Sequence, residues 1–336
     1  MAQAKQERVP PLRKFYQIID HGDAASKAAA LPEFPRILEL EITNHCNFHC
    51  LMCKTGTGTC KRERGYMRWE VYEKLLEEAQ GREIAFKFVG QGEPTLHPEA
   101  LKMVCAAAER GITCHMTTNG SLLTEENMEE WITSGLASIK FSFQGVDAAG
   151  YRELRLKDDF EALYHRIARF WQLRGNRAFP FISVCTSITD ETPEQVQAFR
   201  EKFAPVCDQV EVGFTTLEFI DASKIENAQS REKFLQIQQR QMLNKVRYPC
   251  CNQVFDILAV HWNGDVTACC ADTNDEMVLG NLNEHSLAYF WTCEREQEFR
   301  TILGQGKYDS LPLCRHCYDF MRYMHKQSQA EGEAGA

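Results

Sequence analysis

Two patterns of apolar and polar residues alternate along most of this chain. Residues 36–43 alternate between apolar and polar side chains one position at a time, which is typical of a strand with two unlike faces. Residues 69–79 instead repeat apolar side chains every three or four positions, which predicts a helix with one buried face. Because the same pair of patterns recurs up to residue 214, the chain is expected to alternate strands and helices.

The alternation predicts about six strand–helix units. Thr124 and Pro193 support two of the helices, because threonine caps the amino end of a helix and proline suits its first turn. Further strands are expected at 84–89, 114–117, 138–143, 181–188 and 209–214, and further helices at 98–110, 124–134, 159–173 and 192–203. Such units build a parallel sheet whose chemistry lies at the carboxyl ends of the strands. Six units are too few for a closed eight-unit barrel, so an α/β fold with a partial (β/α)6 barrel is expected.

The pattern changes after the sixth unit. Residues 222–245 predict a charged helix, and Ser286 is placed to cap a helix that continues to residue 299. Residues 254–260 and 266–268 flank Asn263-Gly264, which predicts a β-hairpin because this pair adopts the positive φ angles of a tight turn. We therefore expect an arm at 1–35, a barrel at 36–220, a helical linker at 221–248, a small α+β domain at 249–326 and a disordered tail at 327–336.

Composition narrows the class of protein. The 336 residues suit about two domains, and 44% hydrophobic with 25% charged residues is ordinary for a globular chain. The net charge is −9 and no basic patch dominates, which argues against nucleic acid and anionic membranes as partners. No apolar run approaches the roughly 18 residues of a membrane span. The amino-terminal residues lack the apolar stretch of a secretory signal, so a cytoplasmic location is expected.

Cysteine is the outlying residue type, with 15 copies. An odd count excludes complete pairing into disulfides, and cytoplasmic thiols stay reduced, so clustered cysteines point to metal or redox chemistry. Cys46, Cys50 and Cys53 have the spacing C-x3-C-x2-C directly after the first strand. Three thiolate ligands leave one position of a bound metal centre open, as catalytic metal sites do. The alternative is a zinc site completed by a distant ligand, with His45 or His49 nearby.

This spacing resembles the signature of the radical S-adenosylmethionine (SAM) family, in which it follows the first strand of a partial (β/α)6 barrel. Gly90-Gln91-Gly92-Glu93-Pro94 follows the second strand and is similar to the family's Gly-Gly-Glu-Pro motif, with glutamine in place of a frequent glycine. Thr118-Asn119-Gly120 follows the third strand, and Ser142-Phe-Gln-Gly145 ends the fourth, with Tyr151 to Arg155 just beyond. The resemblance covers residues 36–215.

The resemblance implies a set of cofactors and a site for them. A 4Fe–4S cluster on Cys46, Cys50 and Cys53 would bind SAM and pass one electron to it. The resulting 5′-deoxyadenosyl radical would abstract a hydrogen atom from the substrate. A flavodoxin- or ferredoxin-type partner would supply the electron. The residues implied in binding SAM are Gly90, Gly92, Glu93, Pro94, Asn119, Ser142 and Arg155.

A second group of cysteines lies near the carboxyl end. It resembles the twitch form of the SPASM domain, an auxiliary 4Fe–4S domain that follows many radical SAM barrels, with the implied ligands Cys251, Cys269, Cys314 and Cys317. Because no cysteine follows Cys317, only one auxiliary cluster is expected. Complete ligation by four thiolates suits electron transfer or a structural role. A shift by one place, to Cys250 or Cys270, stays open, and so does a four-cysteine zinc ribbon.

Several outcomes can follow hydrogen abstraction. Oxidation of a carbinol on a sugar-like or aminocyclitol-like molecule is the first expectation, with a base among Glu218, Asp221 and His261. A cysteine that returns a hydrogen atom would instead make an epimerase, and the candidate donors are Cys250, Cys270 and Cys293. Modification of a peptide is a third outcome, and a zinc-binding scaffold without activity is a fourth. Three further cysteines lie in apolar patterns and are interpreted as small buried hydrophobes: Cys105, Cys114 and Cys185.

Overall fold

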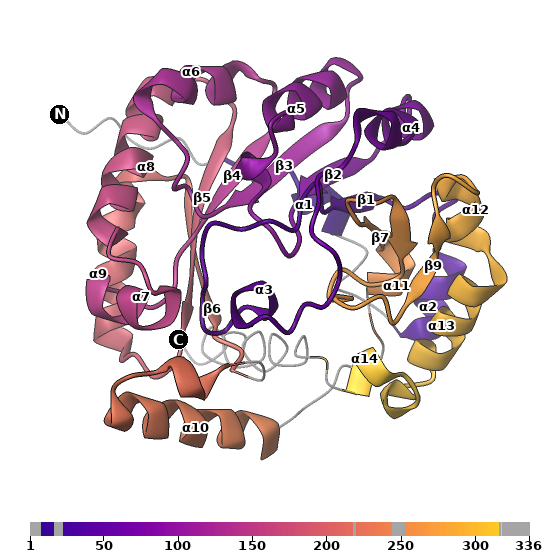
Figure 1. Cartoon of the computed structure of the whole chain (residues 1–336). Coiled ribbons are helices and arrows are strands. Elements are labelled where there is room, and N and C mark those ends of the chain that lie inside the picture. Colours follow the sequence, from indigo (N-terminus) through magenta and orange to yellow (C-terminus); the bar gives the residue numbers. More distant parts are fainter. Residues whose placement is uncertain are drawn as a thin grey trace.

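The computed structural model describes residues 8–16, 23–217, 220–243, 251, 253–315 and 317. Within these residues, the strands form one sheet in the order β6-β5-β4-β3-β2-β1-β7-β8-β9 (Figure 1). Six parallel strands come from the repeating part of the chain: β1 (Ile37–Leu40), β2 (Ala85–Phe88), β3 (Thr113–Thr118), β4 (Ser138–Ser142), β5 (Phe181–Ile188) and β6 (Gln209–Phe214). All six predicted strands are confirmed.

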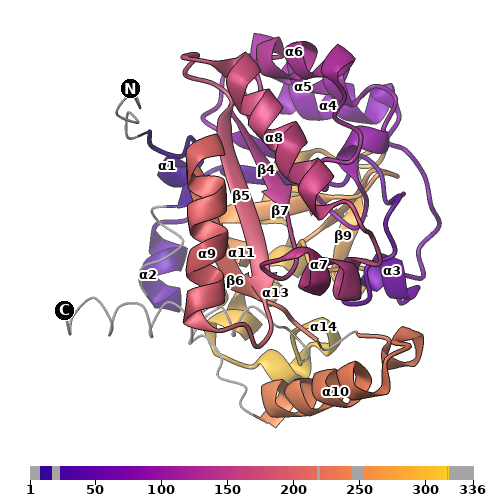
Figure 2. The ribbon, with the colours of Figure 1, turned by 90° about the vertical axis from the view of Figure 1, so that its left-hand side faces the viewer.

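Helices cover the outer face of the parallel strands: α4 (Trp69–Ala79), α5 (Ala100–Glu109), α6 (Glu125–Thr133), α8 (Phe160–Arg174) and α9 (Pro193–Phe203). Each lies within two residues of its predicted range. Figures 1 and 2 show α8 and α9 outside β5. The cap expected at Thr124 precedes α6, and Pro193 opens α9 as predicted. The structure adds a cap at Thr192, which precedes α9. A short helix, α7 (Ala148–Arg155), was not predicted.

The parallel strands form a partial barrel that stays open. β1 pairs with β2 on one side and with β7 (Ile257–Val260) on the other, while β6 ends the sheet. The carboxyl-terminal part therefore extends the same sheet with β7, β8 (Asp265–Thr267) and β9 (Val278–Asn281). β7 and β8 form the predicted hairpin, and Gly264 takes the positive φ of its turn, +90°. The α/β class and the partial (β/α)6 barrel are confirmed.

Three local predictions in the carboxyl-terminal part differ from the structure. The strand expected at 254–260 starts as one helical turn, α11 (Gln253–Asp256). The helix expected from Ser286 to residue 299 is two helices, α12 (Leu287–Thr292) and α13 (Glu294–Gly304), because Cys293 takes extended angles between them. The helix expected at 222–245 is a 3-10 turn, η3 (Ala222–Lys224), followed by α10 (Ala228–Leu243).

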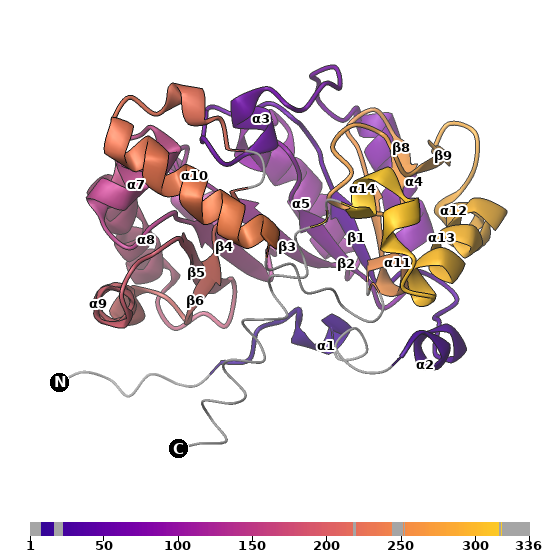
Figure 3. The same ribbon diagram turned by 90° about the horizontal axis from the view of Figure 1, so that it is seen from below.

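Helix α10 closes one side of the first cysteine loop. Its Phe234 and Ile237 are buried against Leu51 of that loop and Leu154 of α7, and Figure 3 shows α10 beside α7. Further short elements are α3 (Lys54–Thr57), η1 (Pro94–Leu96), η2 (Ala204–Val206), η4 (Tyr308–Ser310) and α14 (Pro312–Arg315). In Figure 1, α3 lies within the long loop between β1 and α4.

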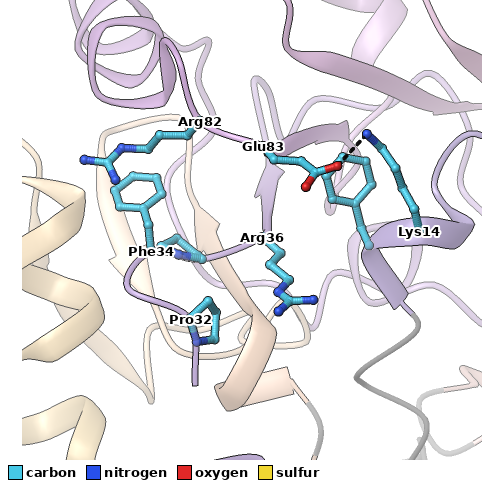
Figure 4. A pocket seen from close by; sticks show the side chains of 8 residues that line it. Lys14, Pro32, Phe34, Arg36, Arg82 and Glu83 are labelled. Atoms are coloured by element: carbon cyan, nitrogen blue, oxygen red, sulfur yellow. Dashed lines mark hydrogen bonds and ion pairs between the residues drawn. The ribbon is translucent and has the colours of Figure 1, made fainter. Parts of the chain in front are cut away.

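The amino-terminal segment, expected as an arm, contributes to the core. It contains α1 (Arg13–Tyr16) and α2 (Ala24–Ala29). Phe15 is 3% exposed and packs with Ile37, Ala85 and Ile257, which begin three adjacent strands. A pocket of about 260 Å³ lies beside this contact, and Figure 4 shows Lys14 pointing to Glu83, 2.8 Å away. The segment therefore covers the amino ends of the strands, opposite the predicted site.

None of the helices in the described part of the chain combines the length and the hydrophobicity that crossing a membrane requires.

Candidate functional site

The first three cysteines lie together in the loop that follows β1. Cys46 and Cys50 each interact electrostatically with Cys53, and the backbone N–H of Cys53 donates to the carbonyl of Cys50 at 3.1 Å. Burial raises the pKa of Cys46, and it raises the pKa of Cys50 to about 11. Without a metal these thiols therefore stay protonated, and a bound cation is what would favour their thiolates. The loop gathers three sulfur donors in a partly buried place.

The loop after β2 packs closely against the cysteine loop. A Cβ at Gly92 would lie 2.2 Å from the carbonyl oxygen of Thr43, so only glycine allows this approach. The backbone N–H of Glu93 donates to the carbonyl of His45 at 2.8 Å. Gly90 lies equally close to β1, because its Cβ would be 2.7 Å from that of Glu41. The glycines of this motif thus place the second loop beside the first.

Glu93 connects this motif to the end of β3. Its side chain is 3% exposed, and its Oε1 accepts a hydrogen bond from the hydroxyl of Thr118 at 2.6 Å. The Oε2 atom accepts from the backbone N–H of Asn119 at 2.7 Å. Asn119 in turn donates to Asn47 Oδ1 at 2.9 Å, which leads back to the cysteine loop. Three of the predicted regions therefore meet in one hydrogen-bonded network.

Arg155 reaches the same place from α7. Its side chain is buried at 7% exposure, and its positive charge lowers the pKa of Cys46 and Cys50 against the larger effect of burial. The guanidinium lies 5.7 Å from the ring centre of Phe48, within the cysteine loop. Its Nε donor has no hydrogen-bond partner among the described residues. A buried cation with an unused donor is suited to an anionic group such as a carboxylate.

The second group of cysteines also comes together. The neighbouring Cys270 and burial raise the pKa of Cys269 well above its usual value, and the charges of Cys251 and Cys317 add to the shift. Cys314 is buried in an apolar cluster of the carboxyl-terminal part, and Cys251 and Cys269 pack against that cluster. Cys250 lies outside the described residues. Both Cys269 and Cys270 are near the group, so the one-place alternative at this pair stays open.

A cavity of about 1110 Å³ connects the interior of the partial barrel with this second group. Alternate residues of β1 to β6 point into it, because neighbouring strands place residues in register on one face. Ser142, one of the predicted SAM-binding residues, is on its wall. Chemistry-bearing side chains from both parts of the chain line the cavity: Glu39, Lys87, His115, Lys140, Glu211, Cys251, Cys269, Cys270, Cys314 and Cys317.

Ion pairs and hydroxyl groups form a polar patch on the cavity wall, which also carries many apolar side chains. Lys140 Nζ lies 2.7 Å from Glu211 Oε2, and Lys87 forms an ion pair with Glu39. His115 lies beside both lysines in the sheet, and its Nδ1 is 2.8 Å from the hydroxyl of Ser138. Burial, followed by the charges of the two lysines, lowers the pKa of His115 well below its usual value. His115 is therefore neutral at physiological pH.

Comparison with known families identifies the two parts of the chain. The model of the radical SAM superfamily matches residues 40–203, and that of the SPASM iron–sulfur cluster-binding domain matches residues 250–318.

The chain belongs to the radical SAM superfamily.

Similar proteins agree with this assignment. A tungsten-containing aldehyde ferredoxin oxidoreductase cofactor-modifying protein of Pyrococcus furiosus is 26% identical over 330 residues, covering 85% of this chain and 90% of that protein. The structure of BtrN with AdoMet and 2-DOIA is 20% identical, covers 84% of this chain and 92% of that chain, and has a TM-score of 0.55. Streptococcus suis SuiB bound to its precursor peptide SuiA is 18% identical, with 83% and 69% coverage and a TM-score of 0.62. Such structural matches establish a shared fold.

The residues of this radical SAM protein fit the cofactors that its two domains imply. Three sulfur donors in one loop are a donor set for an iron–sulfur cluster with one open iron, and the buried Arg155 donor lies beside them. In the second group, Cys251 and Cys269 pack against an apolar cluster that contains Cys314, and Cys269 interacts with Cys317, so their sulfur atoms are candidate ligands for a second cluster. The domains therefore imply two 4Fe–4S clusters and SAM as cofactors.

The structure separates the candidate donors and bases that the sequence suggested. Cys270 lines the cavity, whereas Cys293 lies between α12 and α13, with its thiol 3.4 Å from the carbonyl of Phe290. Neither Asp221 nor His261 is among the residues that line the cavity. Asp221 caps η3, and His261 Nδ1 lies 3.2 Å from Asp275 Oδ1. Glu218 lies outside the described residues.

Several cavity residues were missed by sequence reasoning. Lys87, His115, Lys140 and Glu211 occupy alternate positions of predicted strands, so their polar character on an inward face was the available signal. Cys185, interpreted as a small buried hydrophobe, is only partly buried and lines the cavity. That interpretation is wrong, because β5 turns this position toward the hollow interior. Cys114 is fully buried as predicted, whereas Cys105 is only partly buried, so the prediction is wrong for Cys105 as well.

Proposed function

We propose that this radical SAM protein oxidises a carbinol of a sugar-like or aminocyclitol-like small molecule bound in the barrel cavity. The observation that carries the proposal is the shared wall of this cavity. The inward residues of β1 to β6 and the second group of cysteines line one space. A substrate in that space would contact polar side chains and lie next to a centre that can accept an electron.

The proposal assigns roles to the predicted residues. Cys46, Cys50 and Cys53 hold the cluster that binds SAM. The residues that bind SAM itself are Gly90, Gly92, Glu93, Pro94, Asn119, Ser142 and Arg155. The auxiliary cluster is held by Cys251, Cys269, Cys314 and Cys317. Bound SAM and its cluster supply a carbon radical that removes a hydrogen atom from an unactivated C–H bond.

The protein's own residues would bind the substrate and handle its proton. Lys140 and Glu211 place a donor and an acceptor side by side on the cavity wall, with side chains 27% and 31% exposed. Hydroxyl groups of a sugar-like molecule bind well to such alternating donors and acceptors. Loss of the carbinol proton needs an acceptor within hydrogen-bond reach, and we assign this role to Glu211. Neutral His115 completes the polar lining without adding charge.

An epimerase is the second candidate, because two thiols lie on the cavity wall. Cys185 and Cys270 both line it, so either could return a hydrogen atom to a substrate radical. Peptide modification is a third candidate, in view of the precursor peptide bound to SuiB. These outcomes differ in whether the product is oxidised and whether it takes up hydrogen from solvent.

The test uses anaerobically reconstituted full-length protein. It should bind about eight irons per chain for two 4Fe–4S clusters. On reduction it should release 5′-deoxyadenosine from SAM. Protein that carries only zinc and leaves SAM intact would contradict the enzyme proposal. A panel of aminocyclitols, hexosamines and synthetic peptides, incubated in deuterated water, then separates the outcomes. A product two electrons more oxidised without solvent deuterium supports dehydrogenation, deuterium at an inverted carbon shows epimerisation, and a modified peptide shows the third candidate.

A further inference from the structure

Arg62 and Glu41 form a bidentate ion pair where the loop of the first cysteine group meets the segment of the second. The Nη1 and Nη2 atoms of Arg62 each lie 2.7 Å from one of the two carboxylate oxygens of Glu41. The two side chains are 6% and 5% exposed. Arg62 Nε also donates to the carbonyl of Thr273 at 2.8 Å and lies 3.7 Å from Asp275 Oδ1. One guanidinium therefore connects the end of β1 with the segment that follows Cys269.

Glu41 extends this contact to the SAM-binding motif. Its Oε2 accepts a hydrogen bond from the backbone N–H of Gln91 at 3.1 Å. The backbone of Gly90 lies close enough that a Cβ there would be 2.7 Å from the Cβ of Glu41. The first cysteine loop, the glycine motif and the segment after Cys269 thus meet at a single buried ion pair.

The same two segments are joined at further points. Lys54, next to Cys53, donates from its Nζ to the carbonyl of Ala271 at 3.2 Å. The backbone N–H of Lys61 donates to Asn274 Oδ1 at 2.8 Å, and Asn274 Nδ2 donates to the carbonyl of Thr59 at 3.3 Å. Residues 54–62 and 271–275 are therefore held together along their length, with Arg62 as their buried charged contact.

We propose that Arg62 and Glu41 are positioning residues that fix the auxiliary cluster relative to the SAM-binding cluster. The inference rests on the two cluster ligand sets proposed above, and it is independent of the substrate and the reaction. A buried ion pair adds little net stability, because the loss of hydration offsets much of the attraction. A bidentate guanidinium–carboxylate contact does fix distance and angle, which a single charge does not. Electron transfer between two centres depends steeply on the distance between them.

The experiment measures the distance between the clusters rather than turnover. Arg62→Lys and Arg62→Gln are prepared as fully reconstituted full-length protein, and pulsed EPR records the magnetic coupling of the two reduced clusters. Dipolar coupling falls with the cube of the distance, so a small displacement is visible. We expect both variants to keep the iron content of the parent and to show weaker, more broadly distributed coupling. Lysine keeps the positive charge but cannot make the bidentate contact, so this variant separates the effect of geometry from the effect of charge.

Arg169→Gln is the matched control. Arg169 Nε lies 2.9 Å from each carboxylate oxygen of Glu125, but its side chain is 44% exposed, and the pair connects two outer helices. This variant removes an exposed arginine–carboxylate pair and should leave the coupling unchanged. If both Arg62 variants fold poorly, Glu41→Gln keeps the size and one acceptor, and the same coupling change is expected.

Two results would overturn the positioning role. One is parental coupling in both Arg62 variants. The other is parental coupling in Arg62→Lys together with a lowered reduction potential in Arg62→Gln, since that would show an effect of charge alone. Parent protein that binds about four irons, or none, would instead contradict the proposed ligand sets. The two failures are therefore distinguishable.

Discussion

Glu93 shows how a single buried residue can serve both the fold and the site. Its carboxylate accepts hydrogen bonds from Thr118 and Asn119 at the end of the neighbouring strand. It also belongs to the motif that we propose to bind SAM. The loop after β2 is therefore shaped by the same carboxylate that the cofactor would contact.

Replacing Glu93 with glutamine should weaken the site at this point. The amide offers one acceptor oxygen and turns an NH2 group toward a donor, so a buried hydrogen bond is lost. We expect a loss of about 1–3 kcal/mol in the free energy of unfolding, together with weaker SAM binding. Urea unfolding and calorimetry measure the two effects. Glu99→Gln is the control, because Glu99 makes an exposed pair with Lys102, and its loss should change stability by less than about 1 kcal/mol.

His115 gives the chain a predictable response to acid. Its pKa in the folded state is lower than in the unfolded state, where it is close to the usual 6.5. Below that pH the unfolded chain binds a proton that the folded chain excludes, so the contribution of His115 to stability falls as the pH falls. Between pH 7.5 and 5.5 the loss should be about 1 kcal/mol.

The variant His115→Gln should remove this part of the acid response. Glutamine keeps hydrogen-bonding capacity but does not titrate in this range. The measurement is the difference in unfolding free energy between pH 7.5 and 5.5, compared for the parent and the variant. An equal decrease in both proteins would show that His115 can be protonated in the folded state.

At the scale of elements, two short helices frame the proposed cofactor site in different ways. In α3, a Cβ at Gly56 would lie 2.3 Å from the carbonyl oxygen of Cys50. In α7, a Cβ at Gly150 would meet its nearest atom at 3.5 Å, which is ordinary contact. Helix α3 is thus packed directly on the cysteine loop, whereas α7 has space for a side chain at Gly150.

Alanine should therefore disturb the cysteine loop at Gly56 but be tolerated at Gly150. Gly56→Ala pushes the loop of Cys50 outward, and we expect bound iron to fall from about eight toward about four per chain. Gly150→Ala should bind the full amount of iron and gain about 0.5–1 kcal/mol in stability, because alanine favours a helix interior. Iron analysis and urea unfolding of both variants check this. Full iron content in Gly56→Ala would show that the loop can move without losing its ligands.

At the scale of the whole molecule, the sheet is continuous from β6 to β9, so the two matched domains share one framework. The cavity then has walls from both domains. This arrangement explains how the proposed auxiliary cluster can lie beside a substrate that binds within the barrel.

Removing one proposed auxiliary ligand should separate the two halves of the proposed reaction. Cys314→Ala should lower bound iron from about eight to about four per chain. SAM should still be cleaved, while formation of the oxidised product should fall at least tenfold, because the electron acceptor is lost. Cys105→Ala is the matched control, since Cys105 lies on the outer helix α5 and belongs to neither cysteine group. Unchanged product formation in Cys314→Ala would argue against an auxiliary cluster as the acceptor.

Helix and strand positions in the barrel could be predicted because they depend on neighbours in the sequence. The spacing that makes α4 amphipathic and the alternation that makes β5 a strand are complete within a few residues. Failures occurred where tertiary contacts override the local pattern. Cys293 interrupts the helix predicted from Ser286. Phe15 enters the core although several of its neighbours in the sequence are polar.

The sequence by itself determined the cysteine spacings, the glycine motif and the strand–helix order, since each is read from adjacent residues. Only the tertiary structure decided which polar residues meet. Lys140 and Glu211 are 71 positions apart, and Lys54 and Ala271 are 217 apart. Such contacts depend on the register of strands and the path of loops, which no local pattern encodes. The sequence therefore determines the chemical groups that are available, while the fold determines which of these groups contact one another.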